Sequence, residues 1–268
     1  LLMRKIIAQF IGRKFPYFKG KQKLIRALYT PDRNLNSGDE FTIKYFDKKY
    51  HGITSNYIDW GVYFFGGLEK GLINYFDTVI DQYDYFIDIG SNSGTISLPF
   101  SNYKNLQIIC FEPLDYSYQK LIKNFRINNA LKKNTFHKIA LSNKKGFGYL
   151  YYSLTESNIG TATLQQDRDK IKSVKERVLI DKLDNICKFK NSKIIIKIDV
   201  EGHEDKLIDG ATKLLKNNQI LMYLETFNKK LLKKLRKKGF KCFYPKFIEE
   251  KFSFQKKQYF HHTILKNH

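Results

Sequence analysis

The sequence predicts an α/β protein built on a mostly parallel, doubly wound sheet with an antiparallel last strand. From Tyr85 onward, apolar runs of strand length alternate with segments that can form helices, a pattern typical of such sheets. The first run ends at Asp88 and leads into a loop with glycines at 90 and 94, where the backbone can approach a ligand closely. A second run ends at Glu112, 24 residues after Asp88, where nucleotide-binding α/β folds hold ribose hydroxyls.

Length and charge indicate one α/β domain with basic ends. The 268 residues suit one α/β domain of roughly 200 residues plus an extension. The net charge is +22, of which residues 1–31 carry eight Lys or Arg and no acid, and residues 228–268 carry 13 against two acids. Such ends can attract anionic lipid, a phosphorylated glycan or nucleic acid. A base composition that favours A- and T-rich codons also explains them, so both interpretations stay open.

The N-terminal segment predicts a basic amphipathic helix. Residues 3–28 carry apolar side chains such as Ile6 and Phe10 at helical spacing among Lys and Arg. This helix either lies on a membrane surface or packs on its own domain. Polar turn formers at 30–40 predict a linker. We therefore expect a basic, partly helical extension at 1–50 and a catalytic domain at 51–268.

The expected location is cytoplasmic, with peripheral contact to an anionic membrane left open. No apolar run reaches 18 residues, so no transmembrane helix is predicted. The sequence has no apolar segment followed by a small-residue cleavage site, so no signal peptide is predicted. Three cysteines lie far apart in the sequence, which is typical of a reducing compartment. The sequence does not indicate an oligomeric state.

Secondary structure in the first half follows from apolar periodicity and turn residues. A strand pair is expected at 41–50 and one or two helices at 57–76. The sheet then begins, with strands and helices in the order 85–88, 93–101, 106–111, 116–129 and 135–140.

The second half continues the alternation after three extra β-segments at 146–152, 161–164 and 177–180. The run at 193–199 is almost continuously apolar, which is typical of a strand buried on both faces. A helix at 204–217, a strand at 220–225 and a basic amphipathic helix at 229–238 follow. Late strands at 240–244 and 260–266 are expected to pair antiparallel.

A cluster of polar residues follows the strand at 193–199. Asp199, Glu201, His203 and Glu204 bring three carboxylates and one imidazole together within six residues. The cluster lies at the carboxyl edge of the sheet next to the first strand, where doubly wound sheets bind ligands. The alternative is that Glu204 and Asp199 only stabilise the positive end of the next helix.

The glycine loop does not match the dinucleotide fingerprint, because G-x-G-x-x-G requires Gly at position 92, where Asn92 stands. Its D-x-G-x-x-x-G pattern resembles the first motif of class I S-adenosylmethionine (SAM) methyltransferases. With the further motifs in order, residues 60–266 resemble the FkbM family of SAM-dependent methyltransferases. The motifs are F-I-D-I-G-S-N-S-G at 86–94, F-E-P at 111–113, S-N-I-G at 157–160, K-I-D-V-E-G-H-E at 197–204, D-G-A at 209–211 and L-E at 224–225.

The resemblance implies a Rossmann-like class I methyltransferase fold, SAM as cofactor and O-methylation, often of a sugar hydroxyl in a glycan or natural product. By matching positions, Glu112 would accept the ribose hydroxyls, and adenine would rest near Ala140. Asn158 and Gly160 would form a lid or acceptor wall, and Glu204 would also contact the acceptor. The methionine end of SAM would lie against residues of the glycine loop, namely Asp88, Gly90, Asn92 and Gly94.

Methyl transfer to oxygen needs an aligned hydroxyl and a base. The candidate catalytic residues are Asp199, Glu201 and His203, with Asp199 or His203 as base and Glu201 as an orienting group. Asp199 and Glu201 could together hold a divalent metal, but the sequence offers no clear third ligand, so no metal is predicted.

Two other functions stay open. The basic ends, together with Lys197 two residues before Asp199, also suit an RNA 2′-O-methyltransferase, although the motifs of base methyltransferases are missing and we do not expect nucleic acid as a partner. A non-enzymatic SAM or nucleotide binder is the second alternative. The identity of the acceptor is not indicated.

Overall fold

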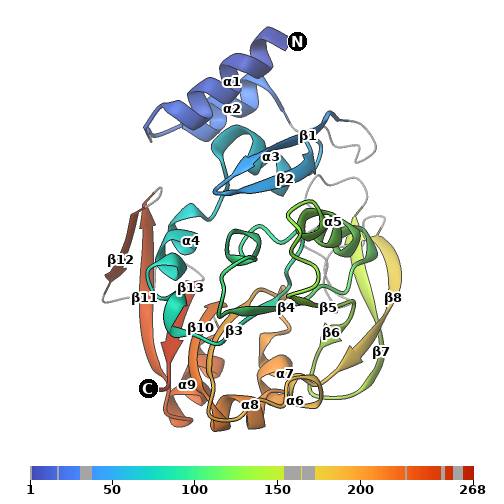
Figure 1. Ribbon diagram of the computed structural model, residues 1–268, viewed down its shortest axis with the longest axis vertical. Helices are drawn as coiled ribbons and strands as arrows, with labels where there is room; N and C mark the ends of the chain where they lie inside the picture. The colour runs from blue at the N-terminus through green and yellow to red at the C-terminus, as the bar shows by residue number, and fades with distance from the viewer. Residues whose placement is uncertain are drawn as a thin grey trace.

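The computed structural model has a large central sheet, with the N-terminal helices at one end of the molecule (Figure 1). It describes residues 2–16, 18–30, 38–153, 164, 173–226, 228–248, 251–255 and 262–268.

The eight-stranded sheet has the order β12-β11-β13-β10-β9-β3-β4-β5. Its five parallel strands are β10 (Gln219–Glu225), β9 (Lys193–Ile198), β3 (Tyr85–Ile89), β4 (Gln107–Phe111) and β5 (Thr135–His137). Strand β13 (His262–Lys266) lies antiparallel between β10 and β11 (Lys241–Ile248), and β12 (Lys251–Gln255) pairs with β11. The predicted fold class is confirmed, whereas β12 was not predicted.

The two faces of the sheet carry separate cores, because successive side chains of a strand point to opposite faces. Phe86 and Ile195 pack toward helices α4 (Lys70–Asp77) and α5 (Asp115–Arg126). Their neighbours Ile87 and Ile196 pack on the other face, with three helices. These helices are α7 (Glu204–Asp209), α8 (Thr212–Asn217) and α9 (Lys229–Lys237).

The N-terminal part packs on helix α3 (Tyr57–Phe65) and consists of α1 (Leu2–Lys14), α2 (Lys21–Leu28) and the hairpin of β1 (Glu40–Tyr45) and β2 (Lys48–Ile53). Ala8 of α1 and Ile25 of α2 share a small core with Trp60. The hairpin belongs to the main core through Tyr45 and Tyr50, so the expected boundary at residue 50 falls inside β2. Among the described residues, no helix has the length and apolar character to cross a membrane.

A separate three-stranded sheet with the order β6-β8-β7 lies beside the carboxyl end of β5 (Figure 1). Its strands are β6 (Ala140–Leu141), β7 (Gly146–Ser153) and β8 (Ser173–Asp181). The strand expected at 161–164 lies outside the described residues except for Leu164. The strand expected at 135–140 is divided, because β5 ends at His137 and β6 joins this other sheet. A short helix, α6 (Leu183–Ile186), follows β8.

One helix prediction was wrong, and a second predicted helix is interrupted. Residues 93–101 form turns and one short 3-10 helix, η2 (Leu98–Phe100); Pro99 has no N–H to continue an α-helical ladder. The helix expected at 204–217 is divided into α7 and α8 at Gly210. A Cβ on Gly210 would lie 1.9 Å from the carbonyl oxygen of Ser142, so only glycine fits where the chain touches this neighbouring loop.

A buried carboxylate joins the hairpin to the sheet. Asp59 is fully buried, accepts hydrogen bonds from Tyr50 (2.6 Å) and from the backbone N–H of Ile53 (2.8 Å), and forms an ion pair with Lys120 of α5. The Tyr50 hydroxyl also lies 2.7 Å from the Ser93 hydroxyl in the glycine loop. This network connects β2, α3, α5 and the loop.

Replacing Asp59→Ala should lower the free energy of unfolding by about 3–5 kcal/mol, because it leaves Lys120 and Tyr50 without their shared partner in a buried site. Urea unfolding measures the loss. The control is Asp81→Ala, an exposed carboxylate, which should change the free energy by less than about 0.5 kcal/mol. Equal effects of the two variants would contradict the role assigned to Asp59.

Candidate active site

The carboxyl ends of β3 and β9 touch at a glycine. Gly90 has a φ of +73°, and a Cβ there would lie 1.9 Å from the carbonyl oxygen of Asp199. The backbone N–H of Asp199 donates to the carbonyl of Ile89 at 3.1 Å. Position 90 therefore needs glycine both for its conformation and because the loop after β9 lies directly against it.

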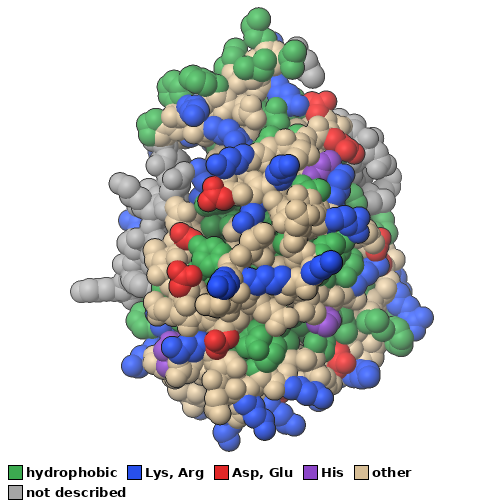
Figure 2. Space-filling view, in the orientation of Figure 1, with side chains coloured by type: hydrophobic (Ala, Val, Ile, Leu, Met, Phe, Trp, Pro, Cys, Tyr) green, Lys and Arg blue, Asp and Glu red, His purple; other side chains and the backbone are tan. Residues whose placement is uncertain are grey.

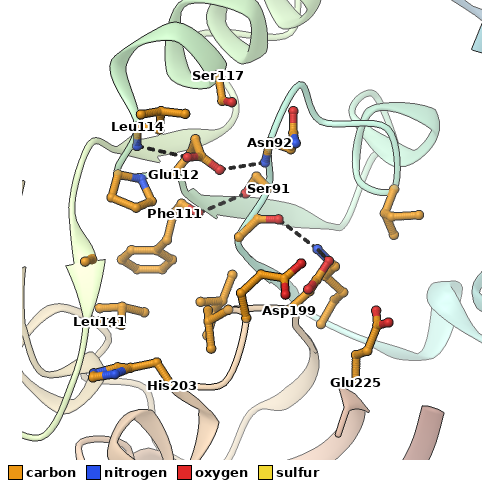
Figure 3. A pocket seen from close by; sticks show the side chains of 18 of the residues that line it. Ser91, Asn92, Phe111, Glu112, Leu114, Ser117, Leu141, Asp199, His203 and Glu225 are labelled. Carbon is orange, nitrogen blue, oxygen red and sulfur yellow. Dashed lines mark hydrogen bonds and ion pairs between the residues drawn. The ribbon is translucent and has the colours of Figure 1, made fainter. Parts of the chain in front are cut away.

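A cavity of about 510 Å³ opens beside this contact, at the carboxyl ends of β3, β4, β9 and β10 (Figure 3). One wall is apolar and includes Leu114, Ala140 and Leu141. The rest is polar. Among the described residues that line it, one side chain is a lysine, Lys197, and five are acidic: Glu69, Glu112, Asp199, Glu201 and Glu225.

Glu112 is held in place by the backbone at the end of β4. Its two carboxylate oxygens accept hydrogen bonds from the backbone N–H groups of Asn92 (2.8 Å) and Leu114 (2.9 Å), as Figure 3 shows. Asn92 adopts a positive φ of +48°, which asparagine tolerates well. Burial raises the pKa of Glu112 to about 7, although the two N–H groups act in the opposite direction.

Two of the predicted cofactor residues support the loop from beneath. Asp88 is fully buried, does not line the cavity, and accepts a hydrogen bond from Ser97 at 2.6 Å. Gly94 also lies off the cavity; a Cβ there would come within 2.8 Å of Leu121 in α5. Gly90, Asn92, Glu112 and Ala140 do line it. The structure thus brings these four together and places Asp88 and Gly94 behind them.

Lys197 is the cation at the centre of the site. It is 4% exposed, and its Nζ donates to the carbonyl of Gly90 at 2.8 Å. The same atom lies 3.5 Å from a carboxylate oxygen of Asp199 and 3.7 Å from one of Asp88. Burial disfavours the charged amine, but the carboxylates, Asp199 foremost, outweigh it, so the pKa of Lys197 lies above its usual range.

Two carboxyl groups on the same side of the cavity are hard to ionise. Burial, and then the charges of Asp199 and Glu69, raise the pKa of Glu225 to about 8. Burial and Asp199 also raise the pKa of Glu69 to about 7, against the attraction of Lys197. Glu69 was missed because it comes from the loop before α4, outside the sheet. Glu225 carries the signal of an acid at the end of a parallel strand, but it had no predicted role.

The three predicted catalytic residues all line the cavity, but they differ in how exposed they are. Asp199 and Glu201 line the cavity, and the Asp199 side chain is 35% exposed. His203 lines it too but is 7% exposed, with its Nε2 2.9 Å from the Ser142 hydroxyl. Burial, and then Lys206, lower the pKa of His203 to about 4, so the imidazole is neutral at neutral pH.

Glu204 does not line the cavity. It is buried in the first turn of α7 and accepts a hydrogen bond from the backbone N–H of Gly202 at 2.8 Å. This placement corresponds to the alternative role, at the positive end of a helix. Asn158 and Gly160 lie outside the described residues. In the part of the chain that the structure describes, no three His, Cys, Asp or Glu side chains are arranged to hold a metal ion.

Comparison with known families decides the class of protein. A sequence profile of the methyltransferase FkbM domain matches residues 88–242, which is more than half of the chain. The chain belongs to the FkbM methyltransferase family. It is a SAM-dependent methyltransferase with the class I fold, as the sequence motifs predicted. Of the alternatives left open above, the non-enzymatic binder is thereby set aside.

Solved structures similar to this FkbM methyltransferase include enzymes of several kinds. The tRNA (uracil-54, C5)-methyltransferase of Pyrococcus abyssi, in complex with S-adenosyl-L-homocysteine, is 10% identical with a TM-score of 0.43, over 85% of this chain and 43% of that one. A SAM-dependent O-methyltransferase of Thermotoga maritima is 10% identical with a TM-score of 0.38, over 72% and 63%. The human methyltransferase 10 domain containing protein is 14% identical with a TM-score of 0.42, over 73% and 79%.

The FkbM chain spans less than half the length of the archaeal tRNA enzyme. No curated protein sequence matches it.

The cavity fits SAM in size and chemistry. Its volume of about 510 Å³ lies within the range of small-molecule sites, about 300–1,000 Å³. The Glu112 carboxylate is pre-oriented at the strand end that holds ribose in this class of fold. The apolar wall at Ala140 and Leu141 suits adenine, and the acidic lining suits a cofactor whose sulfonium and ammonium are cationic.

Replacing Glu112→Gln should weaken the binding of S-adenosylhomocysteine by about 10- to 100-fold, the value of hydrogen bonds to a charged acceptor. Calorimetric titration measures the change. The matched control is Asp115→Asn, an acid three positions further on that is paired with Lys138 outside the cavity and should bind as the wild type does. Unchanged affinity in Glu112→Gln would contradict the assignment of the ribose site.

The raised pKa of Glu225 predicts how stability depends on pH. The folded protein releases this proton near pH 8 and the unfolded chain near 4.5, so between these values the folded state binds more protons and the free energy of unfolding falls as pH rises. Glu225→Gln removes this contribution.

Urea unfolding of the ligand-free protein at about pH 5 and about pH 8 tests this dependence. The variant should gain stability relative to the wild type at the higher pH, and Glu69→Gln should show the same trend over a narrower range, since the pKa of Glu69 is about 7. If the free energies of unfolding of Glu225→Gln and the wild type differ by the same amount at both pH values, the pH dependence assigned to Glu225 is contradicted.

Proposed function

We propose that this FkbM methyltransferase transfers a methyl group to a hydroxyl of a sugar, in a glycan or a natural product. The observation that supports the proposal best is the composition of the cavity: the described residues that line it include five acidic side chains and one lysine. Because the pKa is about 8 for Glu225 and about 7 for Glu69 and Glu112, these three are mostly or partly neutral at pH 7. Carboxyl groups hydrogen-bond sugar hydroxyls in either state, and those that are ionised repel phosphate groups. A neutral acceptor rich in hydroxyls therefore suits this lining better than a polyanion.

The cofactor would lie between the glycine loop and the apolar wall. Glu112 would accept both ribose hydroxyls, Ala140 would contact adenine, and Gly90 and Asn92 would border the methionine end. When bound, SAM would supply a methyl group on a positively charged sulfur. An oxygen nucleophile can attack the methyl carbon, and S-adenosylhomocysteine leaves as the carbon–sulfur bond breaks. The chain contributes by holding the acceptor in line, which can lower the barrier by roughly 7–11 kcal/mol.

Asp199 is the residue to which we assign the acceptor's proton. Its carboxylate faces the cavity and is held by Lys197 at 3.5 Å, and Lys197 itself is fixed on the Gly90 carbonyl. A hydroxyl that donates to this carboxylate would be oriented beside the glycine loop, and its proton could pass to Asp199 as the new C–O bond forms. Such a base contributes about 10²–10⁴-fold to the rate.

His203 has a different place in the proposal. Its Nε2 is engaged with Ser142, and little of the side chain is exposed. We therefore assign His203 a structural role in the cavity wall beside β6, and not the role of the base. Glu201 and Glu225 line the cavity near Asp199 and would orient further hydroxyls of the acceptor.

The RNA 2′-O-methyltransferase hypothesis gains no support from the site. That chemistry would use Lys197 toward the acceptor, whereas this residue is 4% exposed and its ammonium is paired with Gly90, Asp88 and Asp199. The acidic lining would also repel the RNA backbone.

The acceptor class is tested with methyl-labelled SAM on carbohydrate and RNA fractions of a cell extract. The proposal predicts a label that survives mild alkali, since a methyl ether does not hydrolyse there, and that is recovered on a monosaccharide after acid hydrolysis. Label released by alkali as methanol would indicate a carboxyl acceptor, and label released by ribonuclease would indicate RNA. Either result would overturn the proposal.

The base is tested by Asp199→Asn, which should lower the methyl-transfer rate by about 10²–10⁴-fold with little change in the affinity for S-adenosylhomocysteine. The control is Asp205→Asn, an acid in helix α7 that is paired with Lys234 and does not line the cavity. A large loss in His203→Ala together with an active Asp199→Asn enzyme would move the base to His203.

A further inference from the structure

Helix α1 turns its polar and small side chains inward. On the face toward α3, a Cβ on Gly12 would lie 2.1 Å from the carbonyl oxygen of Phe64, so the two backbones are in contact. The Arg13 guanidinium donates to the carbonyls of Val62 and Tyr63, both at 2.9 Å. Lys5 pairs with Asp39 at 2.5 Å. Two cations, a glycine and the buried Ala8, which packs with Trp60, thus hold the helix to the protein.

The opposite face of α1 is apolar and exposed. Leu2, Met3, Ile6 and Phe10 are 72%, 74%, 58% and 59% exposed. A surface helix of a globular protein has the reverse arrangement, with the apolar stripe inward and charges outward. An exposed apolar stripe with charges at its rim is typical of a surface that binds something apolar.

The turn between the helices and helix α2 extend this surface. Phe15, Phe18 and Leu24 are 49%, 38% and 41% exposed. With Ile7, residues 2–24 hold eight of the twelve large apolar side chains that are exposed among the described residues. Figure 2 shows hydrophobic side chains gathered at this end of the molecule, with Lys and Arg beside them. We call this surface the α1–α2 face.

The charge of the α1–α2 face selects its partner. Its exposed charged residues are Arg4, Lys14, Lys19, Lys23 and Arg26, and residues 1–31 contain no acid. Apolar side chains beside a cationic rim complement a bilayer with anionic headgroups, where the first group enters the interface and the second meets the lipid charge. A second copy of the chain would bring two cationic rims together, and the repulsion disfavours such a dimer.

We propose that the α1–α2 face docks on an anionic lipid membrane. This proposal does not depend on which class of acceptor the enzyme methylates. It would place the membrane beside the active site: Gln22 of α2 donates to the Tyr57 hydroxyl at 2.9 Å, and Arg26 lies 5.4 Å from the Tyr57 ring, while Tyr57 lines the cavity. The basic helix α9 lies at the other end of the molecule (Figure 1), so it does not share this contact.

Vesicle flotation of the full chain tests the proposal, with phosphatidylcholine vesicles that contain or lack phosphatidylglycerol. The wild type should float with anionic vesicles and not with neutral ones, and less so at high salt. Ile6→Gln/Phe10→Gln and Arg4→Gln/Lys14→Gln should each lose most of the binding. The control is Phe147→Gln/Leu179→Gln, two apolar residues of similar exposure on β7 and β8, which should bind as the wild type does.

Titration with S-adenosylhomocysteine shows that each variant is folded, since none of these residues lines the cavity. The proposal is overturned if the wild type fails to bind anionic vesicles or binds neutral vesicles equally. It is also overturned if the control variant loses as much vesicle binding as the α1 variants do. Light scattering tests whether a second copy of the chain occupies the face instead. A dimer that dissociates in the Ile6→Gln/Phe10→Gln variant, with no vesicle binding by the wild type, would assign the face to a second copy and overturn the proposal.

Discussion

The site depends on the contact between Gly90 and the carbonyl oxygen of Asp199, where a Cβ would lie 1.9 Å away. The contact brings the loops after β3 and β9 together, and the Lys197 ammonium beneath them binds the Gly90 carbonyl. Any larger residue at position 90 would separate the glycine loop from the loop that carries Asp199. The relative position of the two loops is therefore fixed by backbone packing and by one buried cation, before any ligand binds.

The same cation explains how so many acids share one cavity. Lys197 lies within 3.7 Å of two carboxylates, but it does not neutralise the whole lining. Burial, and then the excess negative charge, raise the pKa values of Glu225 and Glu69 to about 8 and about 7. A cationic cofactor relieves this repulsion, so binding of SAM and ionisation of the acids should favour each other. An acidic site of this kind suits a cationic cofactor and a neutral acceptor.

Strand ends could be predicted from the sequence, because in a parallel sheet the polar residue after each buried run falls at one edge. This logic located Glu112 and Asp199 correctly on the cavity. It could not tell a residue that faces the ligand from one that supports the loop, so Asp88 and Gly94 were predicted to line a cavity that they only support. Glu69 lies outside the strand pattern altogether. The inverted α1 was predicted as amphipathic, but only its contacts with α3 show which face is free.

A crystal structure of the protein with S-adenosylhomocysteine tests the central claim most directly. The account predicts the ligand in the cavity at the carboxyl ends of β3, β4 and β9, with both ribose hydroxyls bonded to the Glu112 carboxylate and the sulfur facing Asp199. A ligand bound elsewhere, or a ribose that does not contact Glu112, would contradict it.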